Sequence, residues 1–360
     1  MRIKEQLSRR ERVLLALSHR TTDRIPISDI CGTLNPPAGE AFNNFLVRHH
    51  NTDAISYIVD IVDTRALTYF YKGPGLETGE DFWGVRRKPV SYGEGSYDEI
   101  YHHPLKDIQT VAELNSYRWP SADWFQYDIT KDVIKGLNGD QQYCIIAGIA
   151  NPFETSWFLR GFEQFFMDMA TKPDLVHGLM RRVTDFFVES FSRLLKAADG
   201  MIDLVFTADD IGQQTGLLMS LPMWTEFIKP CHARINEMVH NMGAKVIYHT
   251  DGAIMTALEG LIDMGIDVLQ ALQFDARGMD PAVLKQQTGD RLCYAGGVSV
   301  QKLLPFGIAE EVTAETKKLI DILGKGGGYI LGPSHCVQAG TPPENIYAMF
   351  ETALSYYPHR

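Results

Sequence analysis

The sequence is poor in cysteine, in positive charge and in long apolar runs, and each shortage excludes a class of protein. Its 360 residues include five cysteines, an odd number without paired short spacings, so a disulfide framework is not expected. Lys and Arg total 34 against 45 Asp and Glu, and the net charge of -11 disfavours nucleic acid or an acidic membrane surface as the main partner. No apolar run is long enough to span a bilayer, so we expect a cytoplasmic protein.

What is present indicates a large buried core. Hydrophobic residues make up 45% of the chain and charged residues 22%, which suits a single domain over residues 1–360. Short apolar runs, most of them rich in Ile, Val, Tyr or Leu, each end in a polar or glycine-bearing turn, at 24–28, 54–59, 143–148, 204–207, 245–248, 268–272, 292–295 and 329–331. Such runs are typical of strands buried on both faces, and helical patterns separate most of them. Eight strand and helix units predict an α/β fold, a (β/α)8 TIM barrel.

Two additions to the barrel are expected. Ser8 and Glu11 form a capping box for a short N-terminal helix that covers the barrel bottom. The second and third strands are separated by a long insertion, 67–142, which predicts a lid or a binding excursion. Within it, the aromatic segments 81–85 and 92–101 predict either a hairpin with an aromatic face or a satellite core packed on the barrel rim.

Polar side chains collect after the predicted strands. In a barrel of this kind the catalytic groups lie at the C-terminal ends of the strands, so these side chains should face one mouth. The candidates, in chain order, are Asn151, Glu154, Asp209, Asp210, Gln213, His249, Asp251, Gln270, Gln273, Ser334, His335 and Cys336.

Several of these candidates are metal-ligating types. Catalytic zinc takes three protein ligands and keeps one position open, and His, Cys and carboxylate are its usual donors. His249 and His335 with one carboxylate, from Asp251 or Glu154, meet that requirement. The alternative for each residue is an ordinary hydrogen-bonding role.

The remaining candidates predict catalytic or substrate-binding roles. The Asp209 and Asp210 pair, with Gln213 close behind, would orient or protonate a substrate, because adjacent carboxylates seldom share one pKa. The alternative is that both carboxylates face a helix N-terminus.

Four further residues are candidates for substrate binding: Asn151, Arg160, Gln273 and Cys336. Arg160 would bind a carboxylate or phosphate, or else form an ion pair on a helix. Cys336 would otherwise be a small buried apolar residue.

Several motifs occur together in one order along the chain. They are Asp-Asp-Ile-Gly-Gln at 209–213, Tyr-His-Thr-Asp-Gly at 248–252, Gly-Gly-Val at 296–298, Tyr-Ile-Leu-Gly-Pro-Ser-His at 329–335 and Thr-Pro-Pro-Glu-Asn at 341–345. This set resembles the uroporphyrinogen decarboxylase-like superfamily over nearly the whole chain. The resemblance implies a (β/α)8 barrel, in agreement with the strand count.

The resemblance is closer to one branch of that superfamily. True decarboxylases carry an arginine-rich N-terminal segment that grips the substrate's carboxylates. The corresponding residues here, 29–35, read Asp-Ile-Cys-Gly-Thr-Leu-Asn without an arginine. The chain therefore looks more like the corrinoid-dependent methyltransferases than like the porphyrinogen decarboxylases.

The expected metal ligands depart from that branch's usual set. Its thiol-methylating members hold zinc with a His-x-Cys pair and a later Cys. His249 matches the histidine, whereas Asp251 and His335 stand where the two cysteines would be. Two imidazoles and a carboxylate make a harder site than thiolates do, which favours an oxygen or nitrogen centre over a thiol.

The resemblance implies methyl transfer between a corrinoid on a partner protein and a small methoxy, methylamine or pterin-type compound. The expected cofactors are zinc and the partner's corrinoid, and a homodimer is plausible. Two alternatives stay open. One is a metal-independent lyase on a nonporphyrin substrate, with Asp210 and His249 handling protons, and the other is a noncatalytic corrinoid-binding module.

Overall fold

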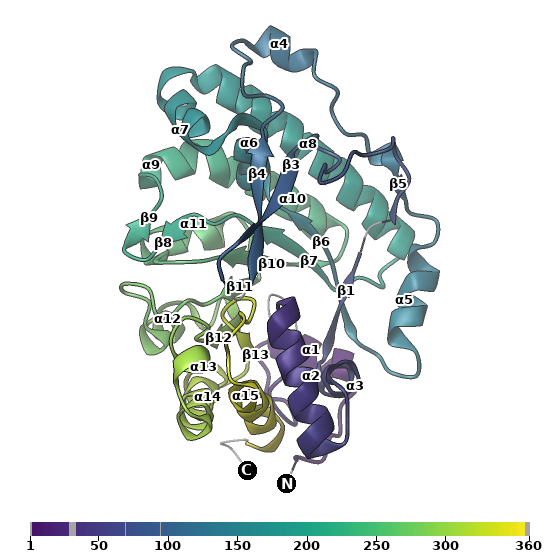
Figure 1. Cartoon of the computed structure of the whole chain (residues 1–360), viewed down its shortest axis with the longest axis vertical. Helices are drawn as coiled ribbons and strands as arrows, with labels where there is room; N and C mark the ends of the chain where they lie inside the picture. The colour runs from purple at the N-terminus through teal and green to yellow at the C-terminus, as the bar shows by residue number, and fades with distance from the viewer. Residues whose placement is uncertain (1, 29–33, 69, 94, 357–360) are drawn as a thin grey trace.

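A computed structural model describes residues 2–28, 34–68, 70–93 and 95–356, and its centre is a curved sheet of parallel strands (Figure 1). Most of the strands in this sheet are apolar and almost entirely buried, as expected where helices cover the outer face. In sheet order they are β1 (Thr64–Leu67), β6 (Cys144–Ala150), β7 (Leu204–Ala208), β10 (Lys245–Thr250), β11 (Val268–Ala271), β12 (Cys293–Val298) and β13 (Tyr329–Pro333).

The predicted first strand, 24–28, lies between the two edges of this sheet. The Ser28 amide donates to the Leu331 carbonyl on β13 at 3.0 Å, and the Leu331 amide donates to Pro26 at 2.8 Å. On the other side, the Asp63 amide, directly before β1, donates to the Ile27 carbonyl at 2.8 Å. This segment therefore closes the barrel, and the predicted fold class is confirmed.

The prediction of a second strand at 54–59 is wrong. These residues belong to helix α3 (Ala54–Ile61), which begins at Asp53, whose side chain accepts a hydrogen bond from the Ser56 amide. A short apolar run does not distinguish a strand from a buried helix by itself. Here the N-cap and the four-residue spacing of the buried Tyr57 and Ile61 favour the helix, and the barrel strand follows as β1.

Helices surround the barrel (Figure 1). Helix α2 (Pro36–His50) precedes β1. The helices after β1 are α4 (Val111–Asn115), η1 (Ala122–Trp124), α5 (Thr130–Asn138), α6 (Pro152–Arg160), α7 (Phe162–Thr171), α8 (Pro173–Ala198), α9 (Leu221–Met223), η2 (Trp224–Ile228), α10 (Lys229–Asn241), η3 (Met255–Ala257), α11 (Leu258–Asp263), α12 (Pro281–Thr288), α13 (Leu303–Phe306), α14 (Ala309–Leu323) and α15 (Pro343–Ser355). Within the described residues, none of the helices combines the length and apolarity needed to cross a bilayer.

The N-terminal helix α1 (Arg9–Leu17) covers the bottom of the barrel, as predicted. Its capping box between Ser8 and Glu11 is present. Val13 and Leu17 are buried in a cluster with inward-facing strand residues, among them Ile146 and Ile247. The helix therefore seals the end of the barrel opposite to the C-terminal ends of the strands.

A buried ionic cluster fixes this helix to the point where the barrel closes. The Asp63 carboxylate accepts hydrogen bonds from Arg12 Nη1 at 2.5 Å, from Arg24 Nη1 at 2.7 Å and from the Ile27 amide at 2.8 Å. The side chains of Arg12, Arg24 and Asp63 are fully buried. Because a buried charge is costly without partners, this geometry ties α1, segment 24–28 and β1 to one another.

The insertion between β1 and β6 forms small elements of its own. β2 (Phe70–Tyr71) pairs with β5 (Phe125–Gln126), and β3 (Arg86–Ser91) forms an antiparallel hairpin with β4 (Ser96–His102). The segment 81–85 is a satellite core rather than part of the hairpin, because Phe82 and Trp83 pack against Phe186 on α8.

Candidate metal centre at the barrel mouth

The predicted ligands on β10 and after β13 meet at the barrel mouth. His249 and Asp251 follow the inward-facing Ile247 at two-residue spacing, so His249 projects from the same strand face toward the mouth. His335 arrives from the loop after β13. Each of the three residues offers a ligand atom within 4.8 Å of the others, which is compatible with one metal ion. Cys336, also in this loop, is not part of that group.

A contact between glycine backbones positions Asp251. Gly252 has φ of 88°, and a Cβ there would lie 2.5 Å from the carbonyl carbon of Gly212. A Cβ on Gly212 would lie 2.4 Å from the Asp251 carbonyl oxygen. The glycines of the 209–213 and 248–252 motifs therefore let the loops after β7 and β10 pack backbone against backbone.

Gln270 orients His249, a role that the sequence reasoning missed. The two residues are in register on neighbouring strands, and His249 Nδ1 lies 2.5 Å from Gln270 Oε1. The amide oxygen can only accept, so Nδ1 carries the proton and the lone pair is on Nε2. Metal-binding histidines are commonly held this way by a second residue. The signal was available, because Gln270 lies near the C-terminal end of the strand paired with β10.

The predicted carboxylate pair separates into two roles. Asp209 is fully buried and accepts hydrogen bonds from the Phe153 and Glu154 amides, at 2.9 and 2.8 Å, and from His232 Nε2 at 2.6 Å. Asp209 therefore anchors the N-terminus of α6, which agrees with the alternative that this carboxylate faces a helix N-terminus. Asp210 lies beside the candidate ligands. Its Oδ1 accepts a hydrogen bond from the Asp251 amide at 2.9 Å and lies 3.6 Å from His249 Nε2. Its predicted catalytic role stays a prediction.

His232, on α10, was not predicted because nothing local in the sequence indicates that a helix residue reaches Asp209. Burial lowers the pKa of His232 to about 3. The neutral imidazole donates through Nε2, and no described group bonds to its Nδ1. We interpret His232 as a positioning residue beneath the mouth.

Glu154 lies beside the three-residue group and is not part of it. Burial, and then the charges of Asp209 and Asp210, raise the pKa of Glu154 to about 8. Asn151 Nδ2 donates to Glu154 Oε2 at 3.3 Å, so the predicted substrate residue Asn151 contacts the carboxyl group. Of the two carboxylates offered as the third ligand, Asp251 is the one that the fold brings to both histidines.

Three other predicted residues lie in different places. Gln273 is buried, and its Oε1 accepts from the Gly252 amide at 2.8 Å, which supports the ligand-bearing loop. Gln213 is exposed on β8 (Gly212–Gln213), which pairs with β9 (Gly216–Leu217). Arg160 is buried in an ion pair with Asp168 at 2.7 Å and donates to the Leu105 and Lys106 carbonyls. That arrangement favours a structural role for Arg160, tying the insertion to α6 and α7.

A pocket of about 300 Å³ opens directly on the ligands. Asp251, Gln273, His335 and Cys336 line it from the barrel side, and Tyr97 lines it from the hairpin of the insertion. Small-molecule sites are concave and carry a few convergent polar groups, and this pocket has both properties.

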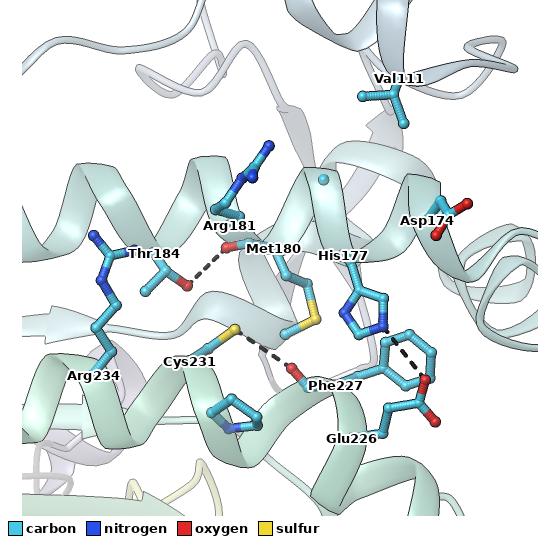
Figure 2. Close-up of a pocket in the computed structure, with 12 residues that line it drawn as sticks. Val111, Asp174, His177, Met180, Arg181, Thr184, Glu226, Phe227, Cys231 and Arg234 are labelled. Atoms are coloured by element: carbon cyan, nitrogen blue, oxygen red, sulfur yellow. Dashed lines mark hydrogen bonds and ion pairs between the residues drawn. The ribbon is translucent and has the colours of Figure 1, made fainter.

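A second pocket, of about 340 Å³, lies outside the barrel between α8 and α10 (Figure 2). Figure 2 shows His177 and Glu226 toward one end, with Cys231 and Thr184 farther along the two helices. His177 Nε2 lies 3.4 Å from Glu226 Oε1. Burial raises the pKa of the Cys231 thiol to about 11, so the thiol is protonated at neutral pH and is a poor nucleophile or ligand. The mouth pocket is therefore the better candidate for chemistry.

Comparisons with known proteins identify the family. The family model for uroporphyrinogen decarboxylase (URO-D) matches residues 88–356. Uroporphyrinogen decarboxylase of Coxiella burnetii is 19% identical over 263 residues, covering 71% of this chain and 70% of the relative. The enzyme of the same name from Anaeromyxobacter dehalogenans is 25% identical over 221 residues, covering 59% and 58%.

A solved structure agrees with the fold along the full length. A methyltransferase from Methanosarcina mazei superposes with a TM-score of 0.68 at 18% identity, covering 97% of this chain and 98% of that one. At this identity the likeness concerns the fold. Because the family model spans most of the sequence and includes both the β10 and β13 motifs, the chain belongs to the uroporphyrinogen decarboxylase (URO-D) family.

Proposed function

We propose that this protein is a methyltransferase that moves a methyl group between a corrinoid carried by a partner protein and a small methoxy, methylamine or pterin-type compound. One observation carries the proposal: ligand atoms of His249, Asp251 and His335 converge at the barrel mouth. The fold likeness to a methyltransferase supports the same class.

The donor set is compatible with zinc. Two imidazoles and one carboxylate supply three ligands, and the adjoining pocket gives room for the open fourth position of a catalytic site. When bound there, zinc supplies Lewis acidity toward the atom that bears or receives the methyl group. Nitrogen and oxygen donors, in place of thiolates, favour an oxygen or nitrogen atom of the substrate.

The surrounding residues supply orientation and proton handling. Gln270 holds the His249 ring with Nε2 toward Asp210. The Asp210 side chain is 40% exposed at the mouth, so it can accept a proton from a substrate hydroxyl or amine. Burial, and then the charges of Asp209 and Asp210, raise the pKa of Glu154 to about 8, so the Glu154 carboxyl group holds a proton at neutral pH.

The test combines metal analysis with a methyl-transfer assay. The purified protein should contain about one zinc per chain. It should also transfer methyl groups to or from free cobalamin with at least one compound in a panel of methoxyaromatics, methylamines and tetrahydrofolate. Full activity with zinc far below one per chain would refute the Lewis-acid role.

A metal-independent lyase is the second candidate, and the protonated Glu154 beside Asp210 favours it. An acid and a carboxylate at one end of a barrel can exchange protons with a substrate without a metal. The curated relatives are decarboxylases, which fits that chemistry. Release of carbon dioxide from a small carboxylic acid by zinc-free protein, with no methyl transfer in the panel, would favour the lyase.

A further inference from the structure

The hairpin of the insertion contributes a wall to the mouth pocket. Tyr97, on β4, lines this pocket together with Asp251 and His335. Its ring lies 5.1 Å from the ring of Tyr92, measured between centroids. An aromatic side chain from the insertion therefore faces the space that adjoins the candidate ligands.

Gln338 holds the hairpin in this place. Its Oε1 accepts from Tyr97 Oη at 2.8 Å, from Tyr92 Oη at 3.3 Å and from Asn35 Nδ2 at 3.2 Å. Its Nε2 donates to the Cys336 carbonyl at 3.0 Å, within the loop that carries His335. One amide thus joins the insertion, the start of α2 and the ligand-bearing loop, and the position of the tyrosine wall is tied to that of a candidate ligand.

The pocket's charge disfavours an anionic ligand. Among the described residues that line it, none is Lys or Arg, and Asp251 contributes a carboxylate. Asp210 lies on the same side, with Oδ1 3.6 Å from His249 Nε2. A carboxylate or phosphate here would find no cationic Lys or Arg side chain among the described lining residues, and the two charges of a zinc ion on His249, Asp251 and His335 would be balanced by the carboxylates of Asp251 and Asp210.

We infer that Tyr97 determines specificity, and that the pocket selects a compact, single-ring methoxy compound without an anionic group, whose ring packs against Tyr97. The inference rests on the proposed function and narrows its substrate class. The volume of about 300 Å³ suits a molecule of this size. The aromatic face and the neutral amides of Gln273 and Gln338 suit an uncharged ring with a polar substituent.

Binding tests the inference without requiring turnover. The probes are 4-methoxybenzyl alcohol and 4-methoxybenzoate, which have similar shapes and differ in charge, titrated into zinc-loaded protein by ligand-observed NMR. We expect the alcohol to bind at least about tenfold more tightly than the carboxylate. Tyr97→Ala should weaken binding of the alcohol about tenfold, because the ring contact is lost.

Tyr101→Ala is the matched control. Tyr101 lies on the same strand, is 52% exposed against 56% for Tyr97, and does not line the pocket. It should bind the alcohol like the wild type, and both variants should keep the wild-type melting temperature because both side chains are exposed. Equal binding of the two probes by the wild type, no binding of the alcohol, or equal losses in both variants would overturn the inference.

The methyl-transfer panel separates this outcome from that of the proposed function. Transfer only with an anionic acceptor, and no binding of the alcohol, would overturn the specificity inference and leave the methyltransferase standing. Tight binding of the alcohol with the expected Tyr97 effect, but no transfer with any compound, would support the pocket assignment and count against methyl transfer.

Discussion

Replacing Gln270 by leucine should weaken zinc binding at His249 without unfolding the protein. Gln270 is 1% exposed, and its Oε1 makes the 2.5 Å contact that fixes the His249 ring and its tautomer. Leucine has nearly the same volume and removes only the polar end. The Gln270 Nε2 has no hydrogen-bond partner among the described residues, so its loss leaves no described acceptor unpaired.

The size of the effect follows from the role of the contact. Loss of a hydrogen bond that orients a metal-binding histidine typically weakens metal affinity about 10- to 100-fold. This range corresponds to about 1.4 to 2.7 kcal/mol. A chelator competition assay with zinc, at a pH where histidine is neutral, measures the dissociation constant directly.

Gln301→Leu is the control for this substitution. Gln301 is an exposed residue that lines the same pocket, so its replacement changes the pocket's polarity without touching His249. Its zinc affinity should equal that of the wild type. If Gln270→Leu also binds zinc with wild-type affinity while circular dichroism shows an intact fold, then His249 is not a ligand or is not oriented by Gln270.

Three further predictions concern the ligands, the ionic cluster and pH. His249→Ala and His335→Ala should each lose stoichiometric zinc and keep the wild-type circular dichroism spectrum, and zinc retained by either variant would show that the ligand assignment is wrong. Asp63→Asn should lower the free energy of unfolding by up to about 3–5 kcal/mol in urea, because two buried guanidinium groups lose the fully buried carboxylate that they share and keep only Asp23 and Glu5 as charge partners; a change below about 1 kcal/mol would contradict this. Burial raises the pKa of Glu154 to about 8, so in zinc-free protein its contribution to stability is complete below about 4.5 and is lost as pH rises through about 8. Glu154→Gln should flatten that decline in urea titrations at successive pH values, and an unchanged slope would show that Glu154 titrates normally.

The barrel was predictable because its strands carry their own signal. Runs such as 204–207 and 245–248 are apolar on both faces, a pattern that is typical of a strand within a covered sheet. The run at 54–59 is equally apolar but forms a helix, since the N-cap at Asp53 and the helical spacing outweigh composition. Apolar content alone therefore did not locate the second strand.

The candidate ligands were predictable for a related reason. A known strand end fixes which face a residue occupies, so His249, Asp251 and His335 could be placed at one mouth without any knowledge of packing. The choice between Asp251 and Glu154 could not be made this way, because it depends on how the loop after β6 packs beneath Asp209.

Contacts between distant segments could not be predicted from the sequence. His232 reaches Asp209 from a helix, and Gln338 joins Tyr97 to Asn35 across most of the chain. Their local sequences contain ordinary polar residues, and their roles appear only when separate elements are brought together. Asp209 and Asp210 were likewise indistinguishable until burial separated the anchored carboxylate from the one at the mouth.

The place where the barrel closes has a consequence for how the protein matures. Segment 24–28 completes the barrel by bonding to Leu331, and His335 follows only four residues later on the same stretch of chain. A nascent chain that has not yet released β13 from the ribosome therefore lacks both its last strand contact and one candidate ligand. High-affinity metal uptake would then occur only after the loop that follows β13 has been synthesised, and metal bound at this mouth would hold that loop to the end of β10 against local opening.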